Sequence, residues 1–462
     1  MLTSGPRILF TAPWDAVAVR RGDALGLRAL ADQFADALAP DLSNRVRDGR
    51  WVTILAWCLT RSQEVFHAGG GISVATRVQE RQRYAWLRPL ELMWVGRTIA
   101  LAEGDWRGRQ LAGQRRVKTW YVDDEQSTDR FGMSVDQYRA YRQTGMYGGY
   151  RLAFRKWPGM TARGDGWTPG PATIKLANWL DERLGIARPA WRLHAGDGDT
   201  ESLSTRSVKL CRGEEHGWWC KKWPTFDQGH TAAEEHTLPR RKDDFSKLPE
   251  AALLEPLIFG QDPSGSRRRE VACEVATATA SGHLGVCEQL GRVFASDRAI
   301  ALLPKFSRLA DAGMVAMDLI AKSLRNTVRL KLTDGDLLRA AEPICEELVA
   351  AAKAWPTNAT SVLSHIQSAH RFADGIRSSR SVDCLAFLLE HHELYGGGLR
   401  WFVHRNGWVE PRTPWRGGSS RYRFRLWSLC RLATQCGVLG TMPRALAEDE
   451  ADENEGLEAA DE

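Results

Sequence analysis

Apolar residues recur at helical spacing along most of the chain. In residues 24–38 they fall three or four positions apart, and Pro40 then ends the pattern, which predicts an amphipathic helix. Residues 50–67 carry a denser apolar pattern and predict a second, more buried helix. The same periodicity returns over 73–88 and 90–101. We therefore expect the first part of the chain to be helical.

Residues 126–194 interrupt this pattern. Ser134–Gln137 has the sequence of a capping box and predicts a helix start. Residues 147–156 look strand-like, and a glycine-rich turn follows at 163–166. The Thr-Pro pair at 168–169 suits the N-cap and first position of another helix. The order of these elements predicts a small winged-helix-like α+β module.

The C-terminal half returns to helical patterns. Residues 270–355 are rich in Ala and Leu and predict helices, and 358–395 predict two more. A short hairpin is expected around Arg405–Gly407, and a basic helix at Arg421–Cys436. Residues 261–269 look like an exposed loop because Gly, Ser, Pro and Arg dominate them.

These patterns predict a mainly α fold, a multi-module helical protein with a winged-helix-like insertion and a short C-terminal hairpin. A chain of 462 residues is also too long for one small core. The expected parts are an N-terminal helical module at 1–125, the winged-helix-like module at 126–194, a linker-rich region at 195–269, a C-terminal helical module with hairpin at 270–440 and a disordered acidic tail at 441–462.

Composition also indicates the cellular compartment of the protein. No run of 18 apolar residues occurs, and the first residues lack the pattern of a signal peptide. The nine cysteines are scattered and lie mostly in apolar stretches, as buried thiols do in a reducing environment. We therefore expect a cytoplasmic protein with no membrane contact.

Charge is strongly segregated along the sequence. The last fifteen residues, Glu448–Glu462, contain nine acids and no base. The remaining 48 acids stand against 63 Lys and Arg, so the rest of the chain carries a formal +15. A basic body attracts polyanions, and an acidic tail can occupy the same surface when they are absent.

Four stretches concentrate the cations: 107–118, 151–163, 267–269 and 412–431. Cations that face one way can neutralise backbone phosphates, while the alternative is a solubility surface of arginines matched to nearby acids. Many of the 19 tryptophans are next to Arg or Lys, and we expect most of them to fill gaps between helices. The predicted nucleic-acid contacts are Arg115, Arg116, Lys118, Arg151, Arg155, Lys156 and Arg163, with Trp167 for packing or stacking.

Motifs for catalysis are missing from the sequence. There is no P-loop, no HExxH and no acid two residues before a lysine, so no catalytic residue and no cofactor is predicted. Consecutive acids at Asp123 and Asp124 leave a metal-dependent nuclease as a remote alternative. One loosely spaced set leaves a structural zinc open: Cys211, His216, Cys220, His230 and His236.

Three segments resemble an uncharacterised bacterial family found in phage-defence and restriction-type islands. They are Ala31–Arg47 with the apolar helix after it, Trp223–Glu235 and Gly397–Trp401. The resemblance implies a setting in defence against foreign DNA, beside helicase, nuclease or methyltransferase subunits. It supplies no catalytic residues, and the acidic tail has no counterpart in it.

These observations lead to three hypotheses for the function. The first is a non-enzymatic DNA-contacting subunit of a multi-protein anti-phage defence system, with DNA and other defence subunits as partners. The second is a protein-binding scaffold of such a complex, which would show no DNA affinity at physiological salt. The third is the metal-dependent nuclease.

Overall fold

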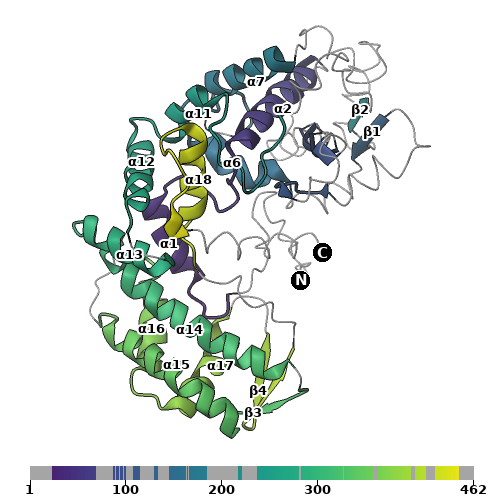
Figure 1. The fold of residues 1–462 in the computed structure, drawn as a ribbon. Helices are drawn as coiled ribbons and strands as arrows, with labels where there is room; N and C mark the ends of the chain where they lie inside the picture. The colour runs from purple at the N-terminus through teal and green to yellow at the C-terminus, as the bar shows by residue number, and fades with distance from the viewer. Residues whose placement is uncertain are drawn as a thin grey trace, which may run out of the picture.

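The described part of the chain forms an arc of helices (Figure 1). The computed structural model describes residues 23–68, 87–88, 90–92, 94–96, 98–99, 108–114, 130–133, 145–162, 164, 166–184, 217–220, 237–279, 282–325, 327–357, 363–396, 401–412 and 422–446. Helices dominate these residues and the strands are few and short. The predicted mainly α fold is confirmed.

One end of the arc is built on α2 (Gly49–Ala68), which packs along α7 (Pro171–Leu184) and beside α6 (Met146–Lys156). Trp51 and Trp57 of α2 are buried in this packing. The Trp57 indole donates a 2.7 Å hydrogen bond to Asp181 of α7, which also pairs with Arg61. Buried charge is tolerated here because each group has a partner.

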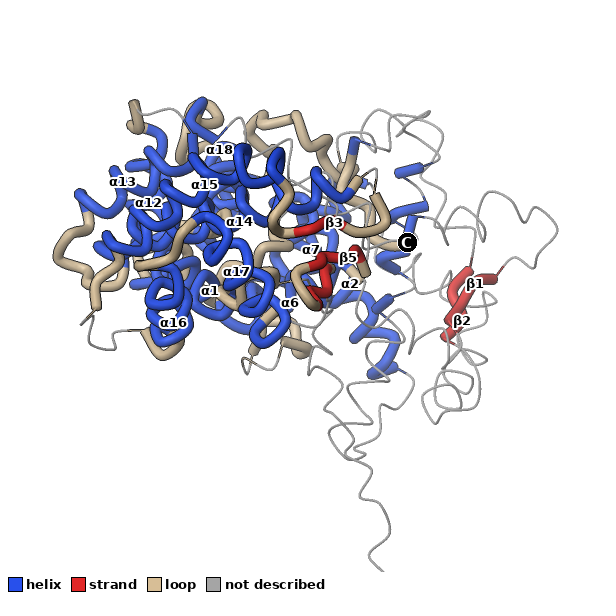
Figure 2. The backbone as a smooth tube through the Cα atoms, turned by 90° about the horizontal axis from the view of Figure 1, so that it is seen from below, coloured by secondary structure: helices blue, strands red, loops and turns tan. Residues whose placement is uncertain are grey.

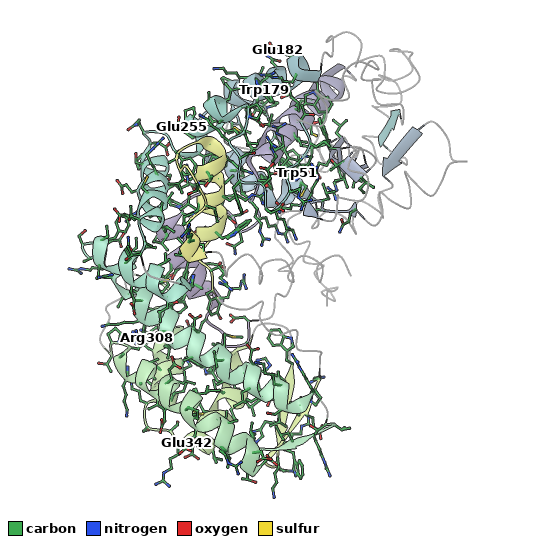
Figure 3. All side chains as sticks on the ribbon, viewed as in Figure 1. Trp51, Trp179, Glu182, Glu255, Arg308 and Glu342 are labelled. Atoms are coloured by element: carbon green, nitrogen blue, oxygen red, sulfur yellow. The ribbon has the colours of Figure 1, made fainter. Side chains whose placement is uncertain are left out.

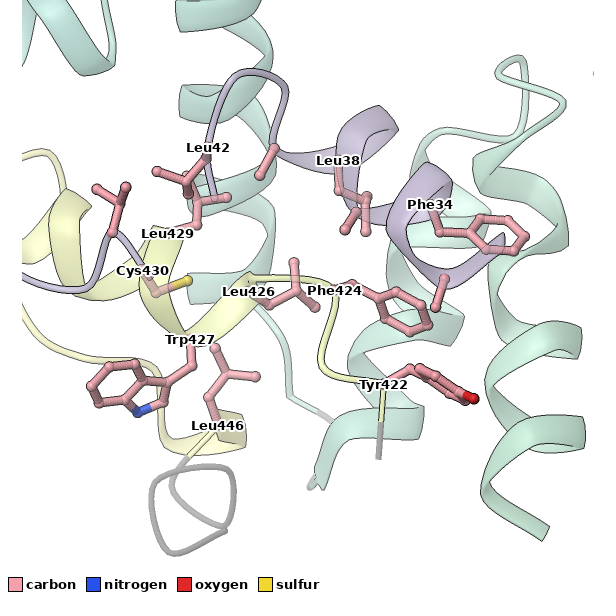
Figure 4. Close-up of a cluster of buried hydrophobic side chains, with 14 of the residues drawn as sticks. Phe34, Leu38, Leu42, Tyr422, Phe424, Leu426, Trp427, Leu429, Cys430 and Leu446 are labelled. Atoms are coloured by element: carbon pink, nitrogen blue, oxygen red, sulfur yellow. The ribbon is translucent and has the colours of Figure 1, made fainter. Parts of the chain in front are cut away.

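The middle of the arc joins segments far apart in sequence. There α1 (Arg28–Leu38), α11 (Ala251–Ile258) and α12 (Pro263–Ala276) surround α18 (Leu426–Cys436). Every residue of α18 is buried. Phe34 and Leu38 of α1 line the same apolar cluster as Phe424 and Leu429 (Figure 4). The predicted helix near the C-terminus exists, but it is a core helix and not a basic surface helix.

The other end is an antiparallel arrangement of longer helices. Its elements are α13 (Gly282–Val293), η3 (Ile300–Leu302), α14 (Leu303–Leu324), α15 (Gly335–Ala354), α16 (Ile366–Ile376) and α17 (Ser381–Tyr395), with η4 (Arg444–Leu446) against α13. Within this end, α14 packs most extensively against α15. Glu182 of α7 and Glu342 of α15 project from opposite ends of the arc (Figure 3).

Two small sheets complete the described structure. A three-stranded antiparallel sheet has the order β3 (Leu330–Lys331), β5 (Trp408–Pro411), β4 (Phe402–Arg405). A separate pair joins β1 (Arg130–Met133) to β2 (Gly217–Cys220), and Figure 2 shows it apart from the first sheet. The predicted hairpin is confirmed as β4 and β5, with Asn406 and Gly407 at φ 52° and 77° in its turn.

Three local predictions are wrong. Residues 147–156 form the helix α6 and not a strand, because Tyr147, Tyr150 and Phe154 are buried at helical spacing. The helix expected at Thr168 begins at Pro171, two residues past the predicted first position. Within the expected loop 261–269, Pro263 already starts α12, and the Asp262 carboxylate caps it by accepting from Gly265 N at 3.0 Å.

Other predictions hold or lie outside the described residues. The helices expected at 24–38, 50–67, 270–355 and 358–395 are confirmed, and the described residues of 90–101 are also helical. Most of the helix expected at 73–88, the helix expected after Ser134, the linker at 195–206 and the acidic tail lie outside the described residues, and residues 87–88 are helical. The module boundaries stay predictions.

Candidate nucleic-acid interface

The predicted nucleic-acid contacts divide into two groups. Arg115, Arg116, Lys118 and Arg163 lie outside the described residues. The other four belong to α6 and to the turn that follows it, so the structure brings these four together. They differ in exposure, which decides which of them can reach a phosphate.

Arg155 and Lys156 are exposed in the last turn of α6. The Arg155 Nε donates to the carbonyl of Gly164 at 3.5 Å, which holds the side chain against the glycine-rich turn. Neither cation forms an ion pair with a described carboxylate. Both sit where the helix carbonyls carry partial negative charge, a favourable place for cations. These two side chains remain available to an anion.

Trp167 is buried, with 1% of its surface exposed. Its ring centroid lies 5.2 Å from that of Tyr147. The Arg151 guanidinium lies 5.3 Å from the centroid of the Trp167 ring, so this arginine covers the indole. Packing, and not base stacking, is therefore the role of Trp167, and Arg151 is half-buried against it.

The cation stretch 267–269 stabilises the fold and does not form a surface. Arg267 pairs with Asp297 at 2.5 Å. Arg268 is buried and donates to the carbonyls of Ile258 at 2.6 Å and Pro40 at 2.5 Å. Arg269 pairs with Glu255 of α11. All three side chains bind α12 to its neighbours, so this stretch is not part of the candidate interface.

The stretch 412–431 is also largely used inside the protein. Arg425 adopts a left-handed backbone with φ 63° and pairs with Asp36 of α1. Arg431 is buried in α18, where its Nη2 donates to the carbonyl of Arg241 at 2.6 Å. Arg412 is the exception, because it is exposed just after β5.

Arg412 belongs to a larger group of exposed cations around the three-stranded sheet, which we call the basic end. Its members come from the last turn of α14, from β3 and the residues before it, and from β4 and the end of β5. They are Lys322, Arg325, Arg329, Lys331, Arg405 and Arg412. All six are exposed, and none of them forms an ion pair with a described carboxylate.

The nearby acids that the structure describes form no ion pair with these six cations. The Asp334 carboxylate caps α15 by accepting from the backbone N–H groups of Asp336 and Leu337. Asp336 pairs with Arg339 at 3.3 Å. Glu410 of β5 is exposed and forms no ion pair with a described cation. The basic end therefore keeps a surplus of positive charge.

The sheet register places two of these cations on either side of an indole. Trp408 of β5 is opposite Lys331 of β3 and Arg405 of β4. Residues directly opposite across a sheet point to the same face, so the three side chains form one row. The alternate residue Val409 is buried on the other face. Arg329 completes the row, with its guanidinium carbon 4.4 Å from the centroid of the Trp408 ring.

Sequence reasoning missed the basic end as a unit. Its six cations are spread between positions 322 and 412, and only the packing of β5 between β3 and β4 brings them together. Sequence patterns place Arg405 in a turn and Arg412 in a different charge stretch. The antiparallel hairpin was the available signal, since it makes Arg405 and Trp408 neighbours.

The described residues contain no candidate metal centre. No three His, Cys, Asp or Glu side chains within them gather as a metal site requires. Some of their buried carboxylates pair with arginines, as Glu250 does with Arg50 Nε at 2.7 Å. Burial raises the pKa of Glu250, and the Arg50 guanidinium opposes that rise. Asp123, Asp124 and the side chains of the Cys/His set lie outside the described residues.

Two further findings bear on the class of protein. Among the helices that the structure describes, none is both long and apolar enough to cross a lipid bilayer. No protein-family model, curated protein or solved structure matches the chain.

Proposed function

We propose that this protein is a non-enzymatic DNA-contacting subunit that binds sugar-phosphate backbones through the basic end. The observation that carries the proposal is the contrast between two kinds of cation. The arginines of α12 and α18, in the middle of the arc, are buried or paired, whereas the six cations at the basic end are exposed and without a described carboxylate partner. Clustered cations without such partners are what phosphate binding requires.

Arg155 and Lys156 provide a second contact in this proposal. They are exposed on α6, which lies toward the other end of the arc from the basic end. Cooperation with other subunits of an anti-phage defence system is part of the proposal and rests on the sequence resemblance. The acidic tail would compete with DNA for the same cations.

The proposal is tested by the salt dependence of DNA binding. Fluorescence anisotropy of a labelled 20-base-pair duplex should show an affinity that falls steeply between about 50 and 200 mM salt. Lys331→Ala with Arg405→Ala should weaken binding and reduce the slope of log K against log salt by about two, close to one per lost phosphate contact.

The matched control removes two cations elsewhere on the same helical end. Arg308 pairs with Glu288 at 2.8 Å, and Lys353 is exposed in the last turn of α15. Arg308→Ala with Lys353→Ala changes the net charge equally and should leave the slope near that of the wild type. Equal losses in both double variants would show a diffuse charge effect and overturn the assignment of the basic end. Absent binding at physiological salt, with a stable co-purifying protein, would favour the scaffold hypothesis.

A further inference from the structure

We infer that the outer face of the β3–β5–β4 sheet binds single-stranded nucleic acid, with a base stacked on the Arg329–Trp408 pair and phosphates held by Lys331 and Arg405. This inference rests on the proposed function and names the form of nucleic acid that the basic end prefers. It is carried by the side chains of the sheet and not by the charge surplus alone.

The geometry supplies a stacking platform with a cation on each side. Neighbouring strands lie about 4.8 Å apart, so Lys331 and Arg405 flank Trp408 at that spacing. The Arg329 guanidinium lies over the indole, 4.4 Å from its centroid. An arginine over an aromatic ring adds a cationic guanidinium to the site, and unpaired bases stack on aromatic rings and on guanidinium planes.

A duplex cannot use such a platform. Its bases are stacked on one another inside the helix, so a half-buried Trp408 on the face of a sheet would touch only the backbone. A single strand exposes base faces next to its phosphates, and proteins bind it through aromatic side chains set among cations. Trp408 and its three cations match that pattern.

The rest of the face sets the limits of the site. Val403 of β4 and Glu410 of β5 are opposite one another, and they point to the same side as Trp408. The row of cations therefore occupies one part of the face and Glu410 the adjacent part. A bound phosphate is expected near Lys331 and Arg405 and away from the Glu410 carboxylate.

The test compares four probes on the full-length chain by anisotropy. They are dT20, rU20, a 20-nucleotide abasic strand and a 20-base-pair duplex. We expect dT20 to bind roughly tenfold or more tightly than the abasic strand, which has the same phosphates and no bases. The ratio of dT20 to rU20 shows whether DNA or RNA fits better. Equal affinity for dT20, the abasic strand and the duplex would overturn this inference and leave the proposed function standing.

If the full-length protein binds none of the four probes, the proposed function itself is overturned. Trp408→Leu should erase the preference for dT20 over the abasic strand, and Trp408→Phe should retain it, because phenylalanine keeps a stacking face. Photo-crosslinking of a 5-iodouracil strand to the unmodified protein gives a measurement that needs no variant. A crosslink mapped to Trp408 supports the inference, and crosslinks only at α6 would overturn it.

Discussion

Asp48 is fully buried just before α2, and its carboxylate joins three segments of the chain. It accepts hydrogen bonds from Arg50 N at 3.0 Å, from Arg240 N at 2.8 Å and from Gln435 Nε2 at 3.2 Å. The amide of Gln435 in turn accepts from Gly49 N at 2.8 Å. A single acid thus connects the start of α2 to α18 and to the segment before α11.

Asp48→Asn should lower the free energy of unfolding by about 2–4 kcal/mol. The reason is that the amide nitrogen of the new side chain would face the N–H donors that now bind the carboxylate in this buried site. Urea denaturation measures this change. Asp243→Asn is the control, since Asp243 is exposed and pairs only with Arg241, and it should cost less than about 1 kcal/mol. Equal effects at the two positions would contradict the role given to Asp48.

His391 is a second buried group with a measurable consequence. Its Nε2 donates to the carbonyl of Leu25 at 3.0 Å, and the ring packs against Phe372 and Tyr395. Burial lowers the pKa of His391 to about 4 from the ordinary 6.5. The unfolded chain therefore takes up the proton first, and stability is full above pH 6.5 and lost as the pH falls toward 4.

We expect this one histidine to account for up to about 3 kcal/mol between pH 7.5 and 4. The measurement is the difference in urea stability between the wild type and His391→Gln, which removes the titrating group and keeps a donor for Leu25. As the pH falls, the wild type should lose more free energy of unfolding than the variant does. A constant difference across the range would contradict the assignment.

At the scale of elements, close helix contacts depend on glycines at particular places. Gly375 of α16 faces Phe387 of α17, and a Cβ at Gly375 would clash with the Phe387 ring. Gly335, at the start of α15, has open space where its Cβ would be. The two glycines therefore differ in packing although both are helical.

Gly375→Ala should destabilise the protein by about 1–3 kcal/mol, because the ring must move from a packed site. Gly335→Ala should be neutral or stabilising by up to about 1 kcal/mol, since alanine has the higher helix propensity and meets no atom. Thermal unfolding of both variants measures the contrast. A gain of similar size in both would show that helix propensity, and not packing, controls these positions.

Some helices and the hairpin could be predicted from the sequence pattern. Long amphipathic stretches such as 270–355 are predictable because their apolar residues repeat with the helix itself. The hairpin is predictable from its Asn-Gly turn. Helix α6 is harder to predict because Gly148 and Gly149 mask its pattern, although Gly149 allows Arg45 to approach, with a Cβ there only 2.7 Å from Arg45 Cβ.

Helix α12 escapes prediction for the opposite reason. Its first residues are polar and basic and resemble a loop, yet Asp262 and Pro263 are an N-cap and a first helical residue. The tertiary partners of Arg267, Arg268 and Arg269 lie on other segments, and spacing along the chain does not reveal them. Local signals therefore locate helix starts better than they locate charge pairs.

At the scale of the whole molecule, the sequence predicts that the partner is a polyanion, but it does not predict where on the protein the interface lies. The charge surplus of the body indicates polyanions from composition alone. Which cations stay exposed depends on which arginines the core uses, and that is decided by contacts between residues far apart in sequence. The basic end is the result of that selection.

The acidic tail yields a prediction at this scale. Deleting residues 448–462 should tighten DNA binding and steepen its salt dependence, because nine carboxylates no longer compete with phosphates for the same cations. Anisotropy at several salt concentrations measures both effects. A chain of equal length with these acids changed to Gln or Asn should behave as the deletion does, and unchanged affinity in both would exclude the tail from DNA binding.

The burial of α18 has a consequence for synthesis. Gln435 binds the backbone of Gly49, so the core around α2 needs a segment that leaves the ribosome nearly four hundred residues later. Until α18 has been synthesised, the faces of α11 and α12 that pack against it stay uncovered. Truncations that stop before position 426 should consequently aggregate or recruit chaperones, even when every helix of the first half is present.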